Sequence, residues 1–121
     1  RILGIAIEGS ESELKGIVTG LIGDCISEFG LKADITLDSI LVNDHYTGAG
    51  YGMMAAPEIE AIKLAASLEG LLLDPVYTGR AAAGMIDLVR KGFFKKDERV
   101  LFWHTGGTPA LFADTYLNGL Q

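Results

Sequence analysis

The sequence predicts an α/β domain with a mostly parallel sheet and flanking helices. Short apolar or β-branched runs alternate along the chain with segments of helical periodicity, in the order β-α-β-α-(β)-α-β. The apolar runs are nearly continuous, as is typical of parallel strands that are covered on both faces. The length of 121 residues, with 49% hydrophobic and 21% charged residues, fits one globular domain.

The first strand and helix are expected in the opening 30 residues. The apolar run Arg1–Ile7 predicts a buried strand that ends at a turn. Ser10 or Ser12 can then cap a helix, and Gly30 can end it. Apolar residues at i, i+3, i+4 and i+7 spacing over four turns predict that one face of this helix is buried: Leu14, Ile17, Val18, Leu21, Ile22, Cys25, Ile26 and Phe29.

The second strand and helix are separated by a long glycine-rich loop. Asp34–Val42 alternates and contains several β-branched residues, which predicts a strand. Asn43–Met54 contains three glycines and two tyrosines and is expected to be the loop. Pro57 suits the first turn of a helix that runs to about Glu69, just before Gly70.

The last third of the chain repeats this alternation. Leu71–Leu73 predicts a short extended run closed by an Asp-Pro turn, and Val100–Trp103 predicts a final strand. Between them, about Gly79 to Lys91 is expected to be helical and to end at Gly92. A short helical turn is expected after Pro109. The inner side of the helix is expected to contain Ala81, Ala82, Met85, Ile86 and Val89.

Composition disfavours several classes of partner. With 10 Lys and Arg against 16 Asp and Glu, the net charge of −6 disfavours nucleic acid and anionic membrane surfaces. The apolar runs are far shorter than the roughly 20 residues that span a bilayer. The single cysteine, Cys25, permits no internal disulfide and suits a reducing compartment, so a cytoplasmic location is expected. No spacing of His, Cys, Asp or Glu matches a metal site.

A ligand site is expected where the predicted strands end. Asn43–Tyr51, Val76–Gly79 and His104–Thr108 each follow the carboxyl end of an extended run, where open α/β sheets bind ligands. These segments are rich in glycine, tyrosine and threonine and contain one carboxylate, Asp44. That composition suits a planar or anionic ligand held by hydroxyls and backbone amides.

Each of these features also has a purely structural interpretation. His104–Thr108 can bind an anion with its backbone amides or can be a simple turn. The glycines of Gly48–Gly52 fit a flexible loop, because no helix follows them directly. Tyr77 can be an interior aromatic residue with a hydrogen-bonded hydroxyl.

Three motifs resemble one family in order and spacing. They are DPVYTGR at Asp74–Arg80, GMIDLVRKGFF at Gly84–Phe94 and HTGGTPALFA at His104–Ala113, and the loop around Gly50–Gly52 also matches. The chain from about Val42 onward resembles the pyridoxal-phosphate family of D-cysteine desulfhydrase and 1-aminocyclopropane-1-carboxylate (ACC) deaminase. The resemblance implies a pyridoxal 5′-phosphate cofactor and a small amino-acid substrate.

The resemblance also implies an incomplete site. The family has the fold of the tryptophan synthase β-subunit group (fold type II), with the cofactor between two α/β domains. Residues 1–121 resemble its C-terminal third. The family's Schiff-base lysine and phosphate-binding loop lie in the N-terminal part, so the chain alone is expected to be inactive. As in the family, the full enzyme is expected to be a homodimer.

The resemblance assigns roles to six residues. Tyr51 and Tyr77 match the family's two active-site tyrosines, which are expected to be catalytic. The expected cofactor-binding residues are Thr78, Thr105, Gly106 and Gly107.

The residue at position 78 favours one reaction of the family. ACC deaminases carry a glutamate where this chain has Thr78, and a glutamate can hold the pyridine nitrogen protonated. A neutral threonine suits the loss of a good leaving group, so the expected reaction converts D-cysteine to pyruvate, hydrogen sulfide and ammonia. The alternatives are ACC deaminase, a cysteate-type lyase, and a non-catalytic α/β module that binds a small anion.

Overall fold

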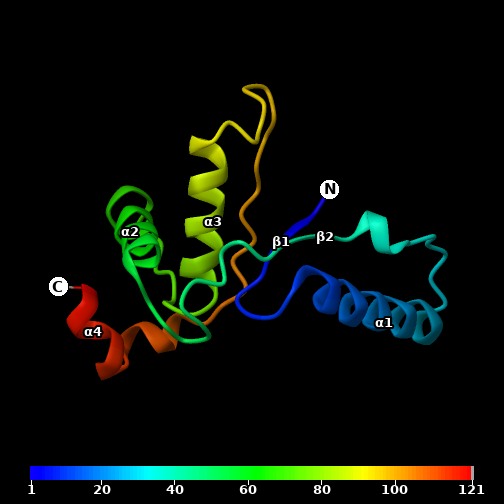
Figure 1. The fold of residues 1–121 in the computed structure, drawn as a ribbon, viewed down its shortest axis with the longest axis horizontal. Helices are drawn as coiled ribbons and strands as arrows, with labels where there is room; N and C mark the ends of the chain where they lie inside the picture. The colour runs from blue at the N-terminus through cyan, green and yellow to red at the C-terminus, as the bar shows by residue number, and fades with distance from the viewer. Residues whose placement is uncertain (121) are drawn as a thin grey trace.

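The chain is built around a small parallel sheet, as seen in a computed structural model that describes residues 1–120 (Figure 1). Strands β1 (Leu3–Ile5) and β2 (Leu41–Asn43) pair in parallel, with Gly4 opposite Val42. Helices surround this two-stranded sheet, so the expectation of an α/β fold with a parallel sheet and flanking helices is confirmed at this level.

Helix α1 (Glu11–Phe29) has the predicted ends. Ser10 and Glu13 form a capping box: the Glu13 N–H donates to Ser10 Oγ at 3.4 Å, and the Ser10 N–H donates to Glu13 Oε2 at 2.9 Å. Gly30 ends the helix with a φ of 60°, a conformation that glycine adopts without steric cost.

The predicted buried face of α1 is wrong for the described part of the chain. None of its residues is buried, and Cys25, expected on the core stripe, is exposed. Figure 1 shows the helix extending away from α2 (Ala56–Leu64) and α3 (Thr78–Arg90). Periodicity identifies the apolar side of a helix but does not identify what covers it, and here the main neighbours of α1 are β2 and the 3₁₀ turn Leu37–Ser39.

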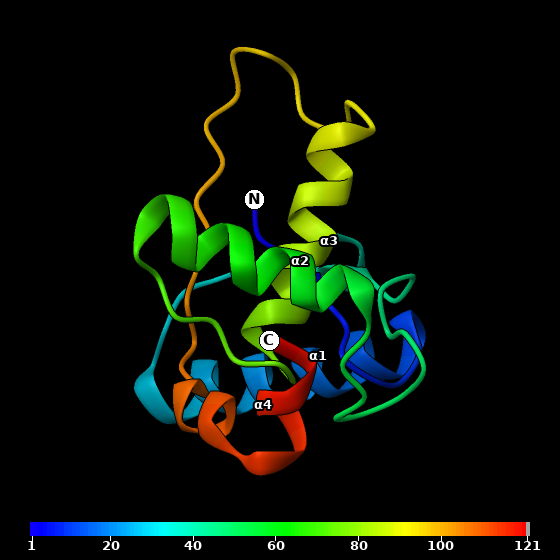
Figure 2. The ribbon, with the colours of Figure 1, turned by 90° about the vertical axis from the view of Figure 1, so that its left-hand side faces the viewer.

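The core lies between α2 (Ala56–Leu64) and α3 (Thr78–Arg90). A π-helical turn (Ala65–Glu69) extends α2 to the predicted end at Gly70. Figure 2 shows α2 crossing α3. The buried residues of this core come from both helices, from the segment between them and from the turn after Pro109. They are Ala61, Ile62, Leu73, Ala82, Ala83 and Leu111.

The buried side of α3 differs in part from the expectation. Ala82 is buried as predicted, but Ala81, Met85 and Ile86 are only half-buried and Val89 is 55% exposed. The fully buried positions of the helix also include Ala83, Gly84 and Leu88. The small residues Ala82, Ala83 and Gly84 allow α2 and β1 to approach α3 closely.

Three strand predictions are wrong in whole or in part. Only the end of Asp34–Val42 is a strand, because a 3₁₀ turn occupies Leu37–Ser39. Leu71–Leu73 and Val100–Trp103 form no strand within residues 1–120. A strand forms only where a neighbouring strand pairs with its backbone groups, and the described residues place none beside these two segments.

The chain ends in two short helical elements. The turn expected after Pro109 is present as a 3₁₀ helix (Thr108–Phe112), and α4 (Asp114–Leu120) follows it without having been predicted. None of the helices within the described residues combines the length and apolarity that a bilayer crossing requires.

Candidate active site

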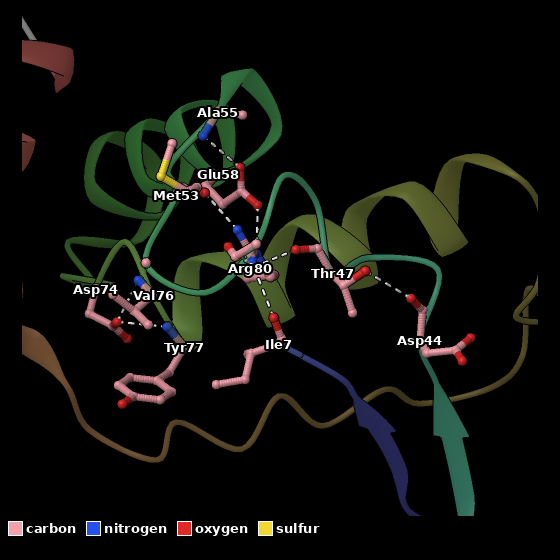
Figure 3. A network of polar contacts seen from close by, with 12 residues as sticks. Ile7, Asp44, Thr47, Met53, Ala55, Glu58, Asp74, Val76, Tyr77 and Arg80 are labelled. Atoms are coloured by element: carbon pink, nitrogen blue, oxygen red, sulfur yellow. Dashed lines mark hydrogen bonds and ion pairs between the residues drawn. The ribbon is translucent and has the colours of Figure 1, made fainter. Parts of the chain in front are cut away.

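Asp74 organises the start of α3. Its carboxylate is fully buried and accepts four hydrogen bonds (Figure 3). Oδ2 accepts the N–H groups of Val76 at 2.8 Å and Tyr77 at 2.7 Å, and Oδ1 accepts the N–H and the hydroxyl of Thr78, both at 2.7 Å. The carboxylate therefore satisfies the free N–H groups at this end of the helix and fixes the backbone that carries Tyr77.

The loop after the last predicted strand packs against this aspartate. Gly107 has a φ of 88°, and a Cβ at this position would lie 2.7 Å from Asp74 Cγ. Thr108 donates its hydroxyl to the Leu72 carbonyl at 3.3 Å, and His104 Nε2 lies 3.2 Å from the same oxygen. The close approach of the backbone to Asp74 thus requires glycine at position 107. Together with the contacts to the Leu72 carbonyl, it joins segments 104–108 and 72–74.

The two predicted catalytic residues meet at their hydroxyls. Tyr51 and Tyr77 hydrogen-bond to each other through their phenol oxygens, and their rings are 6.0 Å apart in an edge-to-face arrangement at 70°. Both side chains remain exposed, at 52% for Tyr51 and 41% for Tyr77. The hydrogen bond with Tyr77, together with partial burial, raises the pKa of Tyr51, so this phenol keeps its proton near neutral pH.

Thr78 lies next to this pair but is 1% exposed. Its hydroxyl donates to Asp74 Oδ1 and accepts the Asp74 N–H at 2.9 Å. In this structure the hydroxyl braces Asp74, and its expected contact with the cofactor remains a prediction.

Thr105 and Gly106 are more accessible than Thr78. Thr105 is exposed, and Gly106 has a φ of 104° with nothing within 4 Å of where a Cβ would stand. The Gly106 N–H donates to His104 Nδ1 at 3.1 Å, which folds the turn back on itself. One side of Gly106 is therefore open, and its expected contact with the cofactor remains a prediction.

The structure brings the three predicted ligand segments together. Tyr51 belongs to the loop after β2, Tyr77 to the start of α3, and Gly107 to the turn that packs on Asp74. Sequence reasoning interpreted Asp74 only as part of a turn. An Asx turn, in which an aspartate side chain accepts the N–H two residues later, is the signal that could have identified this role.

Sequence reasoning also missed a buried ion pair beside the site. Arg80 and Glu58 are 1% and 4% exposed, and Arg80 Nε lies 2.9 Å from Glu58 Oε1 (Figure 3). Charged residues are buried only when they are paired, and no local pattern in the sequence links two residues 22 positions apart.

The Asp74 carboxylate makes the stability of this site dependent on pH. Burial opposes its ionisation, but the hydrogen bonds from Thr78, Tyr77 and Val76 outweigh burial and lower the pKa of Asp74 below 3.8. A carboxylate with a lowered native pKa stabilises the fold above its unfolded pKa, and this contribution is lost as the pH falls through the native value.

Urea unfolding of the full-length protein below about pH 4 measures this dependence. We expect Asp74→Asn to show a smaller loss of unfolding free energy on acidification than the wild type. The same change at the exposed Asp24 provides the control and should retain the wild-type loss. Equal losses in the Asp74 and Asp24 variants would contradict this explanation.

Comparisons with known proteins agree with the geometry. No model of a known protein family matches the chain. It is 39% identical over 121 residues to a protein named 1-aminocyclopropane-1-carboxylate deaminase from Methylobacterium nodulans, covering 98% of this chain and 36% of that protein. It is 45% identical over 112 residues to a protein named D-cysteine desulfhydrase from Salmonella newport, covering 93% of this chain and 33% of that protein.

A solved structure shares the fold. A crystal structure described as an ACC deaminase homologue superposes with a TM-score of 0.80 at 32% identity, covering 98% of this chain and 34% of that one. The chain therefore spans about a third of the length of the relatives that it matches, which agrees with the expected C-terminal third. In sequence and in structure, the chain is similar to about a third of the length of proteins named ACC deaminase and D-cysteine desulfhydrase.

Proposed function

We propose that this chain supplies part of the active site of a pyridoxal-phosphate-dependent lyase that releases ammonia from a small amino acid. The observation that carries the proposal is the exposed, hydrogen-bonded pair of Tyr51 and Tyr77. The turn at Gly106 belongs to a segment that packs against Asp74, and Asp74 fixes the backbone of Tyr77. The rest of the full-length protein would supply the lysine and the phosphate loop.

The residues present fit one wall of a cofactor site. Pyridoxal phosphate, when bound, supplies an electron sink for bonds that break at the α- and β-carbons of an amino acid. Thr105 and the open side of Gly106 would contact the cofactor, because both are accessible and a Cβ at Gly106 would meet nothing. Thr78 and Gly107 would support this wall through their contacts with Asp74.

The tyrosine pair would donate a hydrogen bond to the substrate and stabilise the negative charge that develops on the leaving group. Within the pair, one hydroxyl donates to the other, so the accepting tyrosine has its own proton free for the substrate. The raised pKa of Tyr51 keeps that phenol protonated. The tyrosine that accepts within the pair can use its free proton to donate a hydrogen bond to a leaving thiolate as negative charge develops on sulfur.

D-cysteine is the substrate that we propose. From the resemblance, an ACC deaminase is expected to carry a glutamate at position 78, where this chain has the neutral Thr78. In addition, the Salmonella relative at 45% identity is named D-cysteine desulfhydrase. Loss of the α-proton and of thiolate from the β-carbon leaves an enamine, and addition of water to it gives pyruvate and ammonia, so D-cysteine and water yield pyruvate, hydrogen sulfide and ammonia. ACC is the second candidate substrate, because the relatives at 39% and 38% identity over 98% of this chain are named ACC deaminase.

Product analysis of the full-length protein tests the proposal. We expect equal amounts of pyruvate, sulfide and ammonia from D-cysteine, and little product from L-cysteine, the matched stereochemical control. A four-carbon 2-oxo acid and ammonia formed from ACC alone would replace D-cysteine with the second candidate. No ammonia from either substrate or from cysteate would contradict the proposed lyase activity and favour an anion-binding module.

A further inference from the structure

A buried arginine lies behind the tyrosine pair. Arg80 is in the first turn of α3, three residues after Tyr77, and its side chain is 1% exposed (Figure 3). Its charge is balanced by Glu58, which also accepts the Ala55 N–H at 2.9 Å and so caps α2. Both ends of this ion pair are therefore held by helix termini, and the guanidinium has a fixed position.

The other N–H groups of Arg80 bind the loop that carries Tyr51. Nη1 donates to the carbonyls of Thr47 at 2.6 Å and Gly50 at 3.0 Å, and Nη2 donates to the carbonyl of Met53 at 2.6 Å. These carbonyls precede and follow Tyr51 in the sequence. Nη1 also donates to the carbonyl of Ile7, just after β1, at 3.0 Å. A planar guanidinium with fixed donor directions thus sets the path of the loop.

The loop is shaped to admit the guanidinium. Gly48 has a φ of 63°, and a Cβ at this position would lie 3.2 Å from Arg80 Nη2 and 3.7 Å from Glu58 Oε1. Glycine therefore allows both the left-handed turn and the close approach of the ion pair. Within the described residues, every buried side-chain nitrogen or oxygen has a hydrogen-bond partner, so this network is complete.

We propose that Arg80 is a positioning residue that holds the loop from Thr47 to Met53 so that the hydroxyl of Tyr51 meets that of Tyr77. A single helical turn then positions both tyrosines. Tyr77 begins this turn, and Arg80, which holds the loop of Tyr51, lies within it. The catalytic meaning of this arrangement rests on the proposed function. The positioning itself is a structural claim that can be tested without substrate.

The first test compares two arginines of α3 in the full-length protein. Arg90 pairs with Glu60 of α2 through two hydrogen bonds of 3.0 and 2.7 Å, but it is exposed and makes none of the hydrogen bonds by which Arg80 holds the loop. Arg80→Met and Arg90→Met therefore both remove an ion pair with α2, and only Arg80→Met removes the contacts with the loop. Arg80→Lys keeps the charge and three donors, and it should restore part of the effect.

A second pair of variants leaves the ion pair in place. Gly48→Ala adds a methyl group against the guanidinium, whereas Gly70→Ala adds one at a similar φ of 67° with nothing within 4 Å. The two variants carry the same left-handed backbone strain, and only Gly48→Ala disturbs the contact with Arg80. This pair decides the question if Arg80→Met does not fold.

Tyrosine ionisation followed by ultraviolet absorbance is the readout. The signal of the pair is isolated by subtracting, in each background, the titration of a protein that carries both Tyr51→Phe and Tyr77→Phe. The hydrogen bond with Tyr77 raises the pKa of Tyr51 from 10.0 in the intact pair. We expect this pKa to fall back toward 10.0 in Arg80→Met and Gly48→Ala, and to be unchanged in Arg90→Met and Gly70→Ala.

The same variants should also differ in turnover. We expect kcat to be lowered by roughly 10²-fold in Arg80→Met and little changed in Arg90→Met. The proposal would be overturned if the pKa of Tyr51 in the folded Arg80→Met protein equalled that of the wild type. If Arg80→Met does not fold, an unchanged pKa of Tyr51 in Gly48→Ala would overturn it. If the wild-type protein turns over no substrate, the proposed function fails, whereas the ionisation of Tyr51 still decides the role of Arg80.

Discussion

Replacing Tyr77 by phenylalanine in the full-length protein is expected to lower turnover of D-cysteine by about 10²–10⁴-fold, the usual range for a residue that acts in proton transfer. The change deletes one oxygen from the hydroxyl pair with Tyr51 and keeps the ring in its edge-to-face contact. Cofactor content should stay at the wild-type level, because Asp74 holds this segment through the backbone N–H of residue 77. Steady-state kinetics and the measured cofactor content test both parts.

Tyr46→Phe is the matched control. The Tyr46 hydroxyl donates to Asp87 Oδ2 at 2.7 Å, away from the pair. Burial, together with the hydrogen bond to Asp87 and its charge, raises the pKa of Tyr46 to about 12. Turnover should be little affected by this loss of a hydroxyl. If Tyr77→Phe kept wild-type turnover, Tyr77 would have no part in the mechanism.

Replacing Glu58 by alanine should destabilise the full-length protein by about 3–5 kcal/mol, since it leaves a buried arginine charge without its partner. The same change removes the carboxylate that caps α2 at Ala55. The melting temperature and the free energy of urea unfolding measure the loss.

Glu60→Ala is the matched control on the same helix. Glu60 pairs with Arg90, but the two side chains are 48% and 56% exposed, and an exposed pair contributes at most about 1 kcal/mol. Similar losses in the Glu58 and Glu60 variants would show that burial does not set the energetic importance of the Arg80 ion pair.

Local signals in the sequence account for the elements that were predicted correctly. The capping residue Ser10 and the left-handed Gly30 define α1, and Gly70 ends the helical segment that begins near Pro57. These signals act within a few residues, so they can be interpreted without a tertiary structure. The loops that contain Tyr51 and Tyr77 were located in the same way, from the turn residues around them.

The errors concern features that depend on distant residues. Leu71–Leu73 and Val100–Trp103 have the composition of strands but form none within residues 1–120. The sequence correctly predicts that α1 is a helix, but the prediction that its apolar face is buried is wrong. The network of Arg80 joins residues up to 73 positions apart, and only the folded chain brings them together.

The most direct test of the central claim is the intact mass of the full-length protein after borohydride reduction. Reduction makes the linkage between pyridoxal phosphate and its lysine permanent, so the mass reports whether the cofactor is bound covalently. A protein that contributes Tyr51 and Tyr77 to a pyridoxal-phosphate site should carry one pyridoxyl group per chain. An unmodified mass, in protein purified and reduced with the cofactor present, would contradict the account.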